Sequence, residues 1–186
     1  MIKIGFTGPR PKKLYGYDNK EPYNKLVDSL YNFLLKIKDE EIIATSGGAQ
    51  GYDQIAFWCV HKFKSINPKV KNNVYIPFLG QELNWNPTGL FGQKEYHLML
   101  KYADEVNVIS NVDNNDKRLV VKALFERNKE IVNNSDIIIG AYNGDLKKLE
   151  SESAGGTVDC LKYSIQRNKS IYLINPETYI INKLKY

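Results

Sequence analysis

Short apolar runs alternate along the chain with longer stretches whose apolar residues recur every three or four positions. The short runs are predicted strands at residues 2–6, 41–45, 74–78, 106–110, 136–141 and 170–175. The longer stretches are predicted helices at residues 22–38, 52–65, 94–102, 118–133 and 157–167. Spacings of three and four follow the helical repeat, and continuously apolar strands are typical of a sheet buried on both faces. The alternation therefore predicts a single α/β domain over residues 1–186, with a mostly parallel sheet and helices on both faces.

The amino-acid composition indicates a globular protein and not a membrane-spanning or disulfide-rich one. The 186 residues are 42% hydrophobic and 25% charged, which is ordinary for a globular domain. No apolar run approaches the roughly 20 residues that span a bilayer, and no signal peptide precedes the first strand. Two cysteines far apart in the chain, Cys59 and Cys160, fit reduced thiols better than a disulfide framework. We therefore expect a cytoplasmic protein without a membrane partner.

The net charge of +5 favours anionic ligands, but its lysines are scattered. A dedicated nucleic-acid protein more often carries a clustered basic stripe. The charge pattern therefore favours a small anionic molecule over nucleic acid as the partner.

Three loops between predicted strands and helices carry the candidate chemistry. Glycine lets backbone N–H groups approach a ligand closely, and a helix that starts after such a loop presents unpaired N–H groups and a positive dipole end. These loops predict a site for a phosphate-bearing small molecule, such as a nucleotide or nucleotide derivative. The candidate ligand-binding residues are Thr7, Gly8, Pro9 and Arg10 in the first loop, Ser46, Gly47, Gly48, Ala49, Gly51 and Asp53 in the second, and Gly155, Gly156 and Thr157 in the third.

Individual side chains in these loops have two interpretations each. The second loop matches neither the P-loop nor the dinucleotide-binding fingerprint. The negative charge of Asp53 either stabilises the N-terminus of the following helix, or its carboxylate accepts a hydrogen bond from a ribose hydroxyl. Thr157 could bind phosphate or cap its helix, and these two roles are compatible. Arg10 either closes over a phosphate or is simply an exposed side chain of a tight turn.

Arg127 stands out because the chain has only four arginines. It lies in the helical stripe Val120, Leu124, Arg127, Ile131, whose spacings of four, three and four direct it at the sheet. A buried guanidinium without an anion is costly. We expect Arg127 to bind a ligand phosphate, and the alternative is a salt bridge to a structural carboxylate such as Asp136.

Other chemistries find less support. Trp85, Phe91 and Tyr96 either pack in the core or stack on a base. His61 and His97 are isolated, with no cysteine or histidine at metal-ligand spacing, so we expect no metal site and no cofactor.

Seven short motifs follow one another along nearly the whole chain. They are Gly5-Phe6-Thr7-Gly8-Pro9-Arg10, Ser46-Gly47-Gly48-Ala49-Gln50-Gly51-Tyr52-Asp53, Ile76-Pro77-Phe78, Ala103-Asp104-Glu105-Val106, Glu126-Arg127-Asn128, Ser135-Asp136 and Gly155-Gly156-Thr157. This ordered set resembles the SLOG superfamily, and specifically its YpsA-like branch. One departure is Pro9, where the family usually has histidine.

The resemblance implies a Rossmann-like fold that binds nucleotides or their derivatives. Some relatives are LOG-type phosphoribohydrolases of nucleoside 5′-monophosphates, DprA-like members bind single-stranded DNA, and others sense NAD-derived or cyclic nucleotide signals in anti-phage immunity. Our first hypothesis is a sensor or sequestering protein for an ADP-ribose-like or cyclic nucleotide signal in phage–host defence. A homo-oligomer is compatible with this reading, and the Asn-, Lys- and Ile-rich composition is typical of a bacterial or phage genome rich in A and T.

The resemblance also sets the second hypothesis, a LOG-like hydrolase. Arg127 matches the arginine on which those enzymes rely, but Cys160 occupies the position of their glutamate. Glu95, Glu126 or Asp159 would have to replace it, so the catalytic residues stay open. A single-stranded DNA binder is the third hypothesis, disfavoured by the scattered lysines.

Overall fold

The computed structural model describes residues 1–112, 115–153 and 155–186. The strands are β1 (Ile2–Thr7), β2 (Ile42–Ser46), β3 (Val70–Ile76), β4 (Glu105–Val108), β5 (Ile137–Ala141), β6 (Ser170–Ile174) and β7 (Ile181–Lys183). The helices are α1 (Lys20–Leu35), α2 (Tyr52–Phe63), α3 (Gln93–Tyr102), α4 (Lys117–Asn133), α5 (Leu146–Ser151) and α6 (Gly156–Gln166), with a short 3-10 helix, η1 (Pro11–Lys13).

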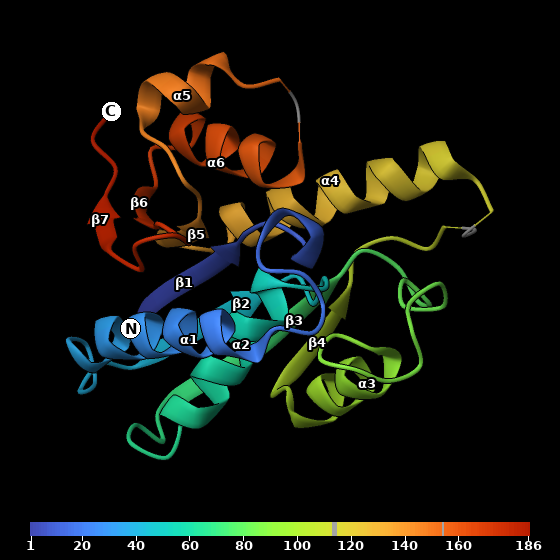
Figure 1. Ribbon diagram of the computed structural model, residues 1–186, viewed down its shortest axis with the longest axis horizontal. Coiled ribbons are helices and arrows are strands. Elements are labelled where there is room, and N and C mark those ends of the chain that lie inside the picture. The colour runs from blue at the N-terminus through green and yellow to red at the C-terminus, as the bar shows by residue number, and fades with distance from the viewer. Residues whose placement is uncertain (113–114, 154) are drawn as a thin grey trace.

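The strands form a seven-stranded sheet in the order β4-β3-β2-β1-β5-β6-β7 (Figure 1). All neighbouring pairs from β4 to β6 are parallel, and β7 joins β6 antiparallel. The predicted α/β architecture with a mostly parallel sheet is confirmed.

Helices cover both faces of the sheet. On one face, α1 and α2 pack on alternate residues of the central strands, such as Ile4 and Ile42, and α3 completes this layer over β3. On the other face, α4, α5 and α6 pack on residues of opposite parity, such as Ile138 and Ile171. The strands β1, β2, β5 and β6 are thus buried on both sides, which explains why they read as continuous apolar runs, whereas the edge strands β4 and β7 are largely exposed.

Besides the short η1, three elements differ from the sequence prediction. Strand β3 begins at Val70 rather than residue 74, because the buried side chains of Asn72 and Asn73 find hydrogen-bond acceptors in Phe57 and Glu105. Helix α5 and strand β7 were not predicted. Both are too short to show a periodic pattern, with six and three residues.

The strand order reverses beside β1, which lies between β2 and β5. In open α/β sheets, ligands bind outside the carboxyl ends of the strands at such a reversal. The loops after β1 and β2 lie at this edge, and the start of α6 packs near them through its contacts with α4 and β1. Among the described residues, no helix is both long and apolar enough to cross a membrane.

Candidate functional site

The loops after β1 and β2 are held together by backbone contacts. The N–H of Tyr52 donates to the carbonyl oxygen of Pro9 at 3.3 Å, and a Cβ at Gly51 would lie 2.6 Å from that same oxygen. Gly51 also has a φ of 93°, which favours glycine. A Cβ at Gly8 would in turn overlap the side chain of Tyr52. Sequence reasoning missed this role of Tyr52, because no local pattern indicates a contact between residues so far apart in the chain.

Arg127 reaches from α4 to the second loop. Only 5% of its surface is exposed, as the inward stripe of α4 predicts. Its Nη1 donates to Oδ2 of Asp53 at 3.2 Å. The same Nη1 lies 1.5 Å from where a Cβ of Gly47 would be, so the guanidinium occupies the space that this glycine leaves open.

Asp53 is the carboxylate that pairs with Arg127. Its Oδ2 also accepts the N–H of Ala49 at 3.4 Å, so the carboxylate faces back toward its own loop. Burial raises the pKa of Asp53, and Arg127 and the N–H of Ala49 offset part of that rise. The alternative of a salt bridge from Arg127 to a carboxylate is thus observed, but its partner is Asp53 and not the suggested Asp136, whose Oδ2 accepts the N–H of Lys3 at 3.0 Å.

Arg10 differs from Arg127 because its side chain is exposed. Its positive charge nevertheless acts on Asp53, whose pKa it lowers. Arg127 thus contacts the carboxylate of Asp53 directly, whereas Arg10 acts on it only through its charge.

Cys160, at the glutamate position of the LOG-type enzymes, lies beside β1. The hydroxyl of Thr7 hydrogen-bonds to its thiol, and the positive charge of Arg127 also acts on it. Burial nevertheless raises the pKa of Cys160 to about 11, so the thiol is neutral near pH 7. It cannot replace a carboxylate as a charged group.

The first turn of α6 forms the third side of the site. Its N-cap is Gly155, whose N–H donates to Oδ2 of Asp159 at 3.0 Å. The cap predicted for Thr157 is therefore wrong, since this residue lies inside the helix. Added Cβ atoms at Gly155 or Gly156 would meet nothing within 4 Å. This turn is thus open on its outer side. Ala154, which precedes it, lies outside the described residues.

Buried polar atoms without partners mark the interior of the site. Within the described ranges, Nε of Arg127, Oγ of Ser46 and the hydroxyl of Tyr52 are buried and form no hydrogen bond. Leaving such groups unsatisfied costs about 1–3 kcal/mol each. The described chain therefore leaves hydrogen-bonding capacity unused beneath the loops after β1 and β2.

Several other candidate residues form contacts within the protein. Phe91 and Tyr96 are buried in the core, and Trp85 packs against Tyr96 with ring centroids 5.2 Å apart. Among the substitute carboxylates, Glu126 accepts from the hydroxyl of Ser110 at 2.9 Å. Asp159 is engaged by Gly155, as described above.

The chain is similar in sequence to a known protein family and to a protein of Bacillus subtilis. A sequence model of the YspA SLOG family (YpsA) matches residues 4–179. The uncharacterized SPbeta prophage-derived protein YoqJ of Bacillus subtilis is 34% identical over 154 residues, which cover 70% of this chain and 81% of that protein.

Solved structures share the fold at low sequence identity. DNA processing protein A (DprA) of Streptococcus pneumoniae superposes with a TM-score of 0.57 at 13% identity, covering 93% of this chain and 50% of that one. DprA of Helicobacter pylori, described for its single-stranded DNA binding mode, gives 0.53 at 16% identity, covering 92% and 64%. TM1055 gives 0.51 at 14% identity, covering 92% and 72%. The chain thus spans only half to under two thirds of the DprA chains.

Proposed function

The chain belongs to the YspA SLOG family, and from this premise we propose that it binds a nucleotide or nucleotide-derived small molecule through its phosphate. The binding site lies where the loops after β1 and β2 meet the first turn of α6. The protein acts there as a sensor or a sequestering protein. The observation that carries this proposal is Arg127, a buried arginine whose Nε has no hydrogen-bond partner within the described chain.

Arg127 supports phosphate binding on energetic grounds. A buried charge is retained where it is paired, and Asp53 supplies one contact to the guanidinium at Nη1. Arginine carries a fork of donors suited to phosphate, so the free Nε has a natural acceptor in a phosphate oxygen. The amides of α6 at Gly156 and Thr157 offer further donors at a helix N-terminus, and the exposed Arg10 closes over the ligand.

We expect the ligand to be bound but not hydrolysed, because the neutral thiol of Cys160 stands where the LOG-type enzymes have their glutamate. The favoured ligands are ADP-ribose-like molecules or cyclic nucleotides, which carry phosphates that Arg127 and Arg10 would share. The prophage origin of the Bacillus relative supports a setting in phage–host defence. The buried free thiols of Cys59 and Cys160 fit the cytoplasm.

The test begins with mass spectrometry of molecules that co-purify with the protein, followed by calorimetry against AMP, ADP-ribose and cyclic dinucleotides. Arg127→Ala should weaken binding of the best ligand by about 1.5–3 kcal/mol, the scale of a charged hydrogen bond. Arg167→Ala, at an exposed residue after α6, is the matched control and should bind as the wild type does. A folded Arg127→Ala protein with unchanged affinity would refute the proposal.

A LOG-like hydrolase is the second candidate, because Asp53 is a buried carboxyl group with a raised pKa beside Arg127. Glycosidic cleavage needs a carboxylate near the sugar. Asp53, however, is engaged by Arg127 and Ala49, so we expect no release of free base from AMP above a no-protein control. Chromatography after long incubation measures this. Base release that is lost in Arg127→Ala would replace the binding function with the enzymatic one.

A further inference from the structure

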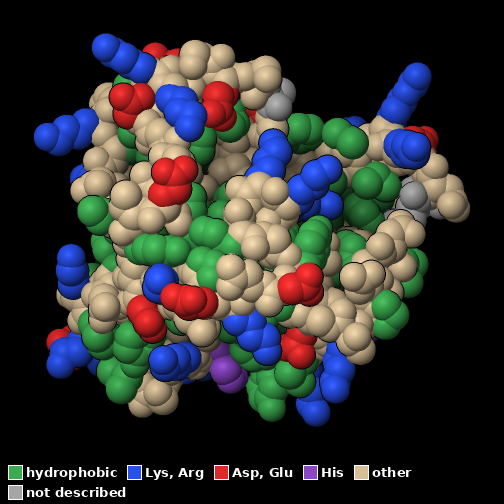
Figure 2. Space-filling view, in the orientation of Figure 1, with side chains coloured by type: hydrophobic (Ala, Val, Ile, Leu, Met, Phe, Trp, Pro, Cys, Tyr) green, Lys and Arg blue, Asp and Glu red, His purple; other side chains and the backbone are tan. Residues whose placement is uncertain are grey.

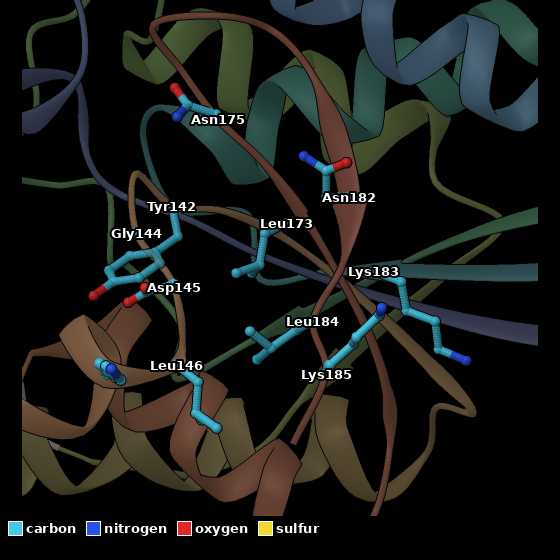
Figure 3. Close-up of a pocket in the computed structure, with 11 residues that line it drawn as sticks. Tyr142, Gly144, Asp145, Leu146, Leu173, Asn175, Asn182, Lys183, Leu184 and Lys185 are labelled. Atoms are coloured by element: carbon cyan, nitrogen blue, oxygen red, sulfur yellow. The ribbon is translucent and has the colours of Figure 1, made fainter.

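A cavity lies at the other end of the sheet from β4, beside strands β6 and β7. Its volume is about 530 Å³, within the range of small-molecule sites. It is bounded by the loop after β5, the first turn of α5 and the strand β7 (Figure 3). None of the residues that line it belongs to the three glycine-rich loops. We call it the β7 cleft.

The interior of the β7 cleft is apolar. Leu173 of β6 and Leu184, which follows β7, lie next to each other between the Tyr142–Leu146 segment and the two lysines Lys183 and Lys185 (Figure 3). Both leucines are buried, and Leu146 and Tyr142 add apolar surface from the opposite side. This lining favours the apolar body of a ligand over a fully hydrated ion.

The charges around the β7 cleft are mainly positive. Lys147, Lys183 and Lys185 line it and are exposed, and in the described part of the chain none of them forms an ion pair. Asp145 is the one carboxylate of the lining, and its Oδ1 already caps α5 by accepting the N–H of Lys148 at 3.0 Å. A concave surface lined by one sign of charge concentrates ions of the opposite sign.

We propose that the β7 cleft binds a small organic anion with an apolar body, at a site separate from the glycine-rich loops. The apolar part contacts Leu173 and Leu184, and the anionic group faces Lys147 and Lys185. The exposed amide of Asn182 lies along the same lining and supplies a neutral hydrogen bond, whereas the half-buried amide of Asn175 is already engaged by Asn143, Glu177 and Thr178. This pairing of an apolar floor with a cationic rim selects against inorganic phosphate, which has no apolar part.

The test uses 8-anilinonaphthalene-1-sulfonate, a fluorescent anion with an aromatic body. We expect saturable binding to the full chain at one site. Lys147→Gln/Lys185→Gln should weaken this binding about tenfold, since two charge contacts are lost. The control, Lys38→Gln/Lys101→Gln, removes the same charge at exposed residues outside the cleft and should bind as the wild type does. Asn182→Trp, at an exposed position of β7, should block the cleft sterically and abolish the signal.

Circular dichroism confirms that each variant is folded before it is compared. Binding that is equally affected in both lysine variants, or that persists in Asn182→Trp, would overturn the inference. Loss of the dye in Arg127→Ala but not in the cleft variants would also overturn it, because the probe would then occupy the glycine-rich loops. Dye binding that survives Arg127→Ala while nucleotide binding is lost would support two independent sites.

Discussion

The guanidinium of Arg127 occupies the space that a side chain at position 47 would need. A Cβ at Gly47 would lie 1.5 Å from Nη1 and 2.6 Å from Oδ2 of Asp53. Any side chain at this position must therefore displace the ion pair. The glycine is required here by the approach of a neighbouring side chain.

We expect Gly47→Ala to lower the free energy of unfolding by about 1–3 kcal/mol or more, the usual cost of overpacking. Gly156→Ala is the matched control, because its Cβ meets nothing within 4 Å and alanine favours the helix that begins there. Urea denaturation of both variants measures the difference. Equal stability of the two would contradict the described position of Arg127.

The pairing of Asp53 with Arg127 predicts a pH-dependent stability. Burial raises the pKa of Asp53 while Arg127 lowers it, so Arg127→Met should raise this pKa further. When the pKa of a carboxyl group is raised in the folded state, the folded state holds the proton more tightly than the unfolded state does. The stability that this provides is complete at low pH and is lost as the pH rises from about 4, the unfolded pKa, through the folded pKa. We therefore expect a deficit of about 3–5 kcal/mol at neutral pH and much less in acid.

Urea denaturation of wild type and Arg127→Met between pH 4 and 8 measures this dependence. The double variant Asp53→Asn/Arg127→Met has no titrating carboxyl at this place and should show a flatter pH profile than the single variant. A deficit that is the same at every pH would mean that lost packing, not the charge of Asp53, causes it.

At the residue scale, the sequence predicts only those features of a side chain that depend on local patterns. The four-three-four spacing around Arg127 was enough to predict that it faces the sheet, because helical periodicity is a local property. Its partner was not predictable, because Asp53 lies 74 residues away and only the fold brings the two together. The same holds for the contact between Thr7 and Cys160, which depends on how α6 packs on β1.

At the scale of elements, α4 offers a test of local stabilisation. Its N-cap, Asp116, accepts the N–H groups of Arg118 at 2.9 Å and Leu119 at 3.3 Å. Asp116→Ala should therefore cost about 1 kcal/mol of stability. At the start of α1, Asn19 occupies the N-cap without a side-chain hydrogen bond, so Asn19→Ala should cost much less. Thermal denaturation compares them, and equal losses would argue against the cap of α4.

Elements that the sequence did not reveal are those with little periodicity. Residues 71–73 look like a loop because they are polar, although Asn72 and Asn73 are buried in β3. Helix α5 depends on its cap at Asp145 and on burial of Leu149 rather than on a repeated stripe. Long elements with several turns or a continuous apolar run were predicted to within a few residues.

At the scale of the molecule, the distribution of charge separates a small-molecule site from a nucleic-acid surface. Lysine and arginine side chains alternate with acidic ones over the face in Figure 2, without a single basic stripe on that face. We expect single-stranded DNA to bind weakly and to dissociate steeply between roughly 50 and 200 mM salt, as counterion release requires. Fluorescence anisotropy with a labelled oligonucleotide measures this. Tight, saturable binding at physiological salt would favour nucleic acid as the partner.

The central place of β1 has a consequence for how the protein is made. One neighbour of β1, strand β2, follows closely in the chain, but the other is β5, and the bond from Lys3 to Asp136 spans 133 residues. At ordinary rates of translation, β5 leaves the ribosome on the order of ten seconds after β1. During that interval an apolar strand carrying Ile4 and Phe6 has one unpaired edge, which is a template for aggregation. The nascent chain therefore passes through a stage in which chaperone protection of β1 matters more than it does for any strand after β5.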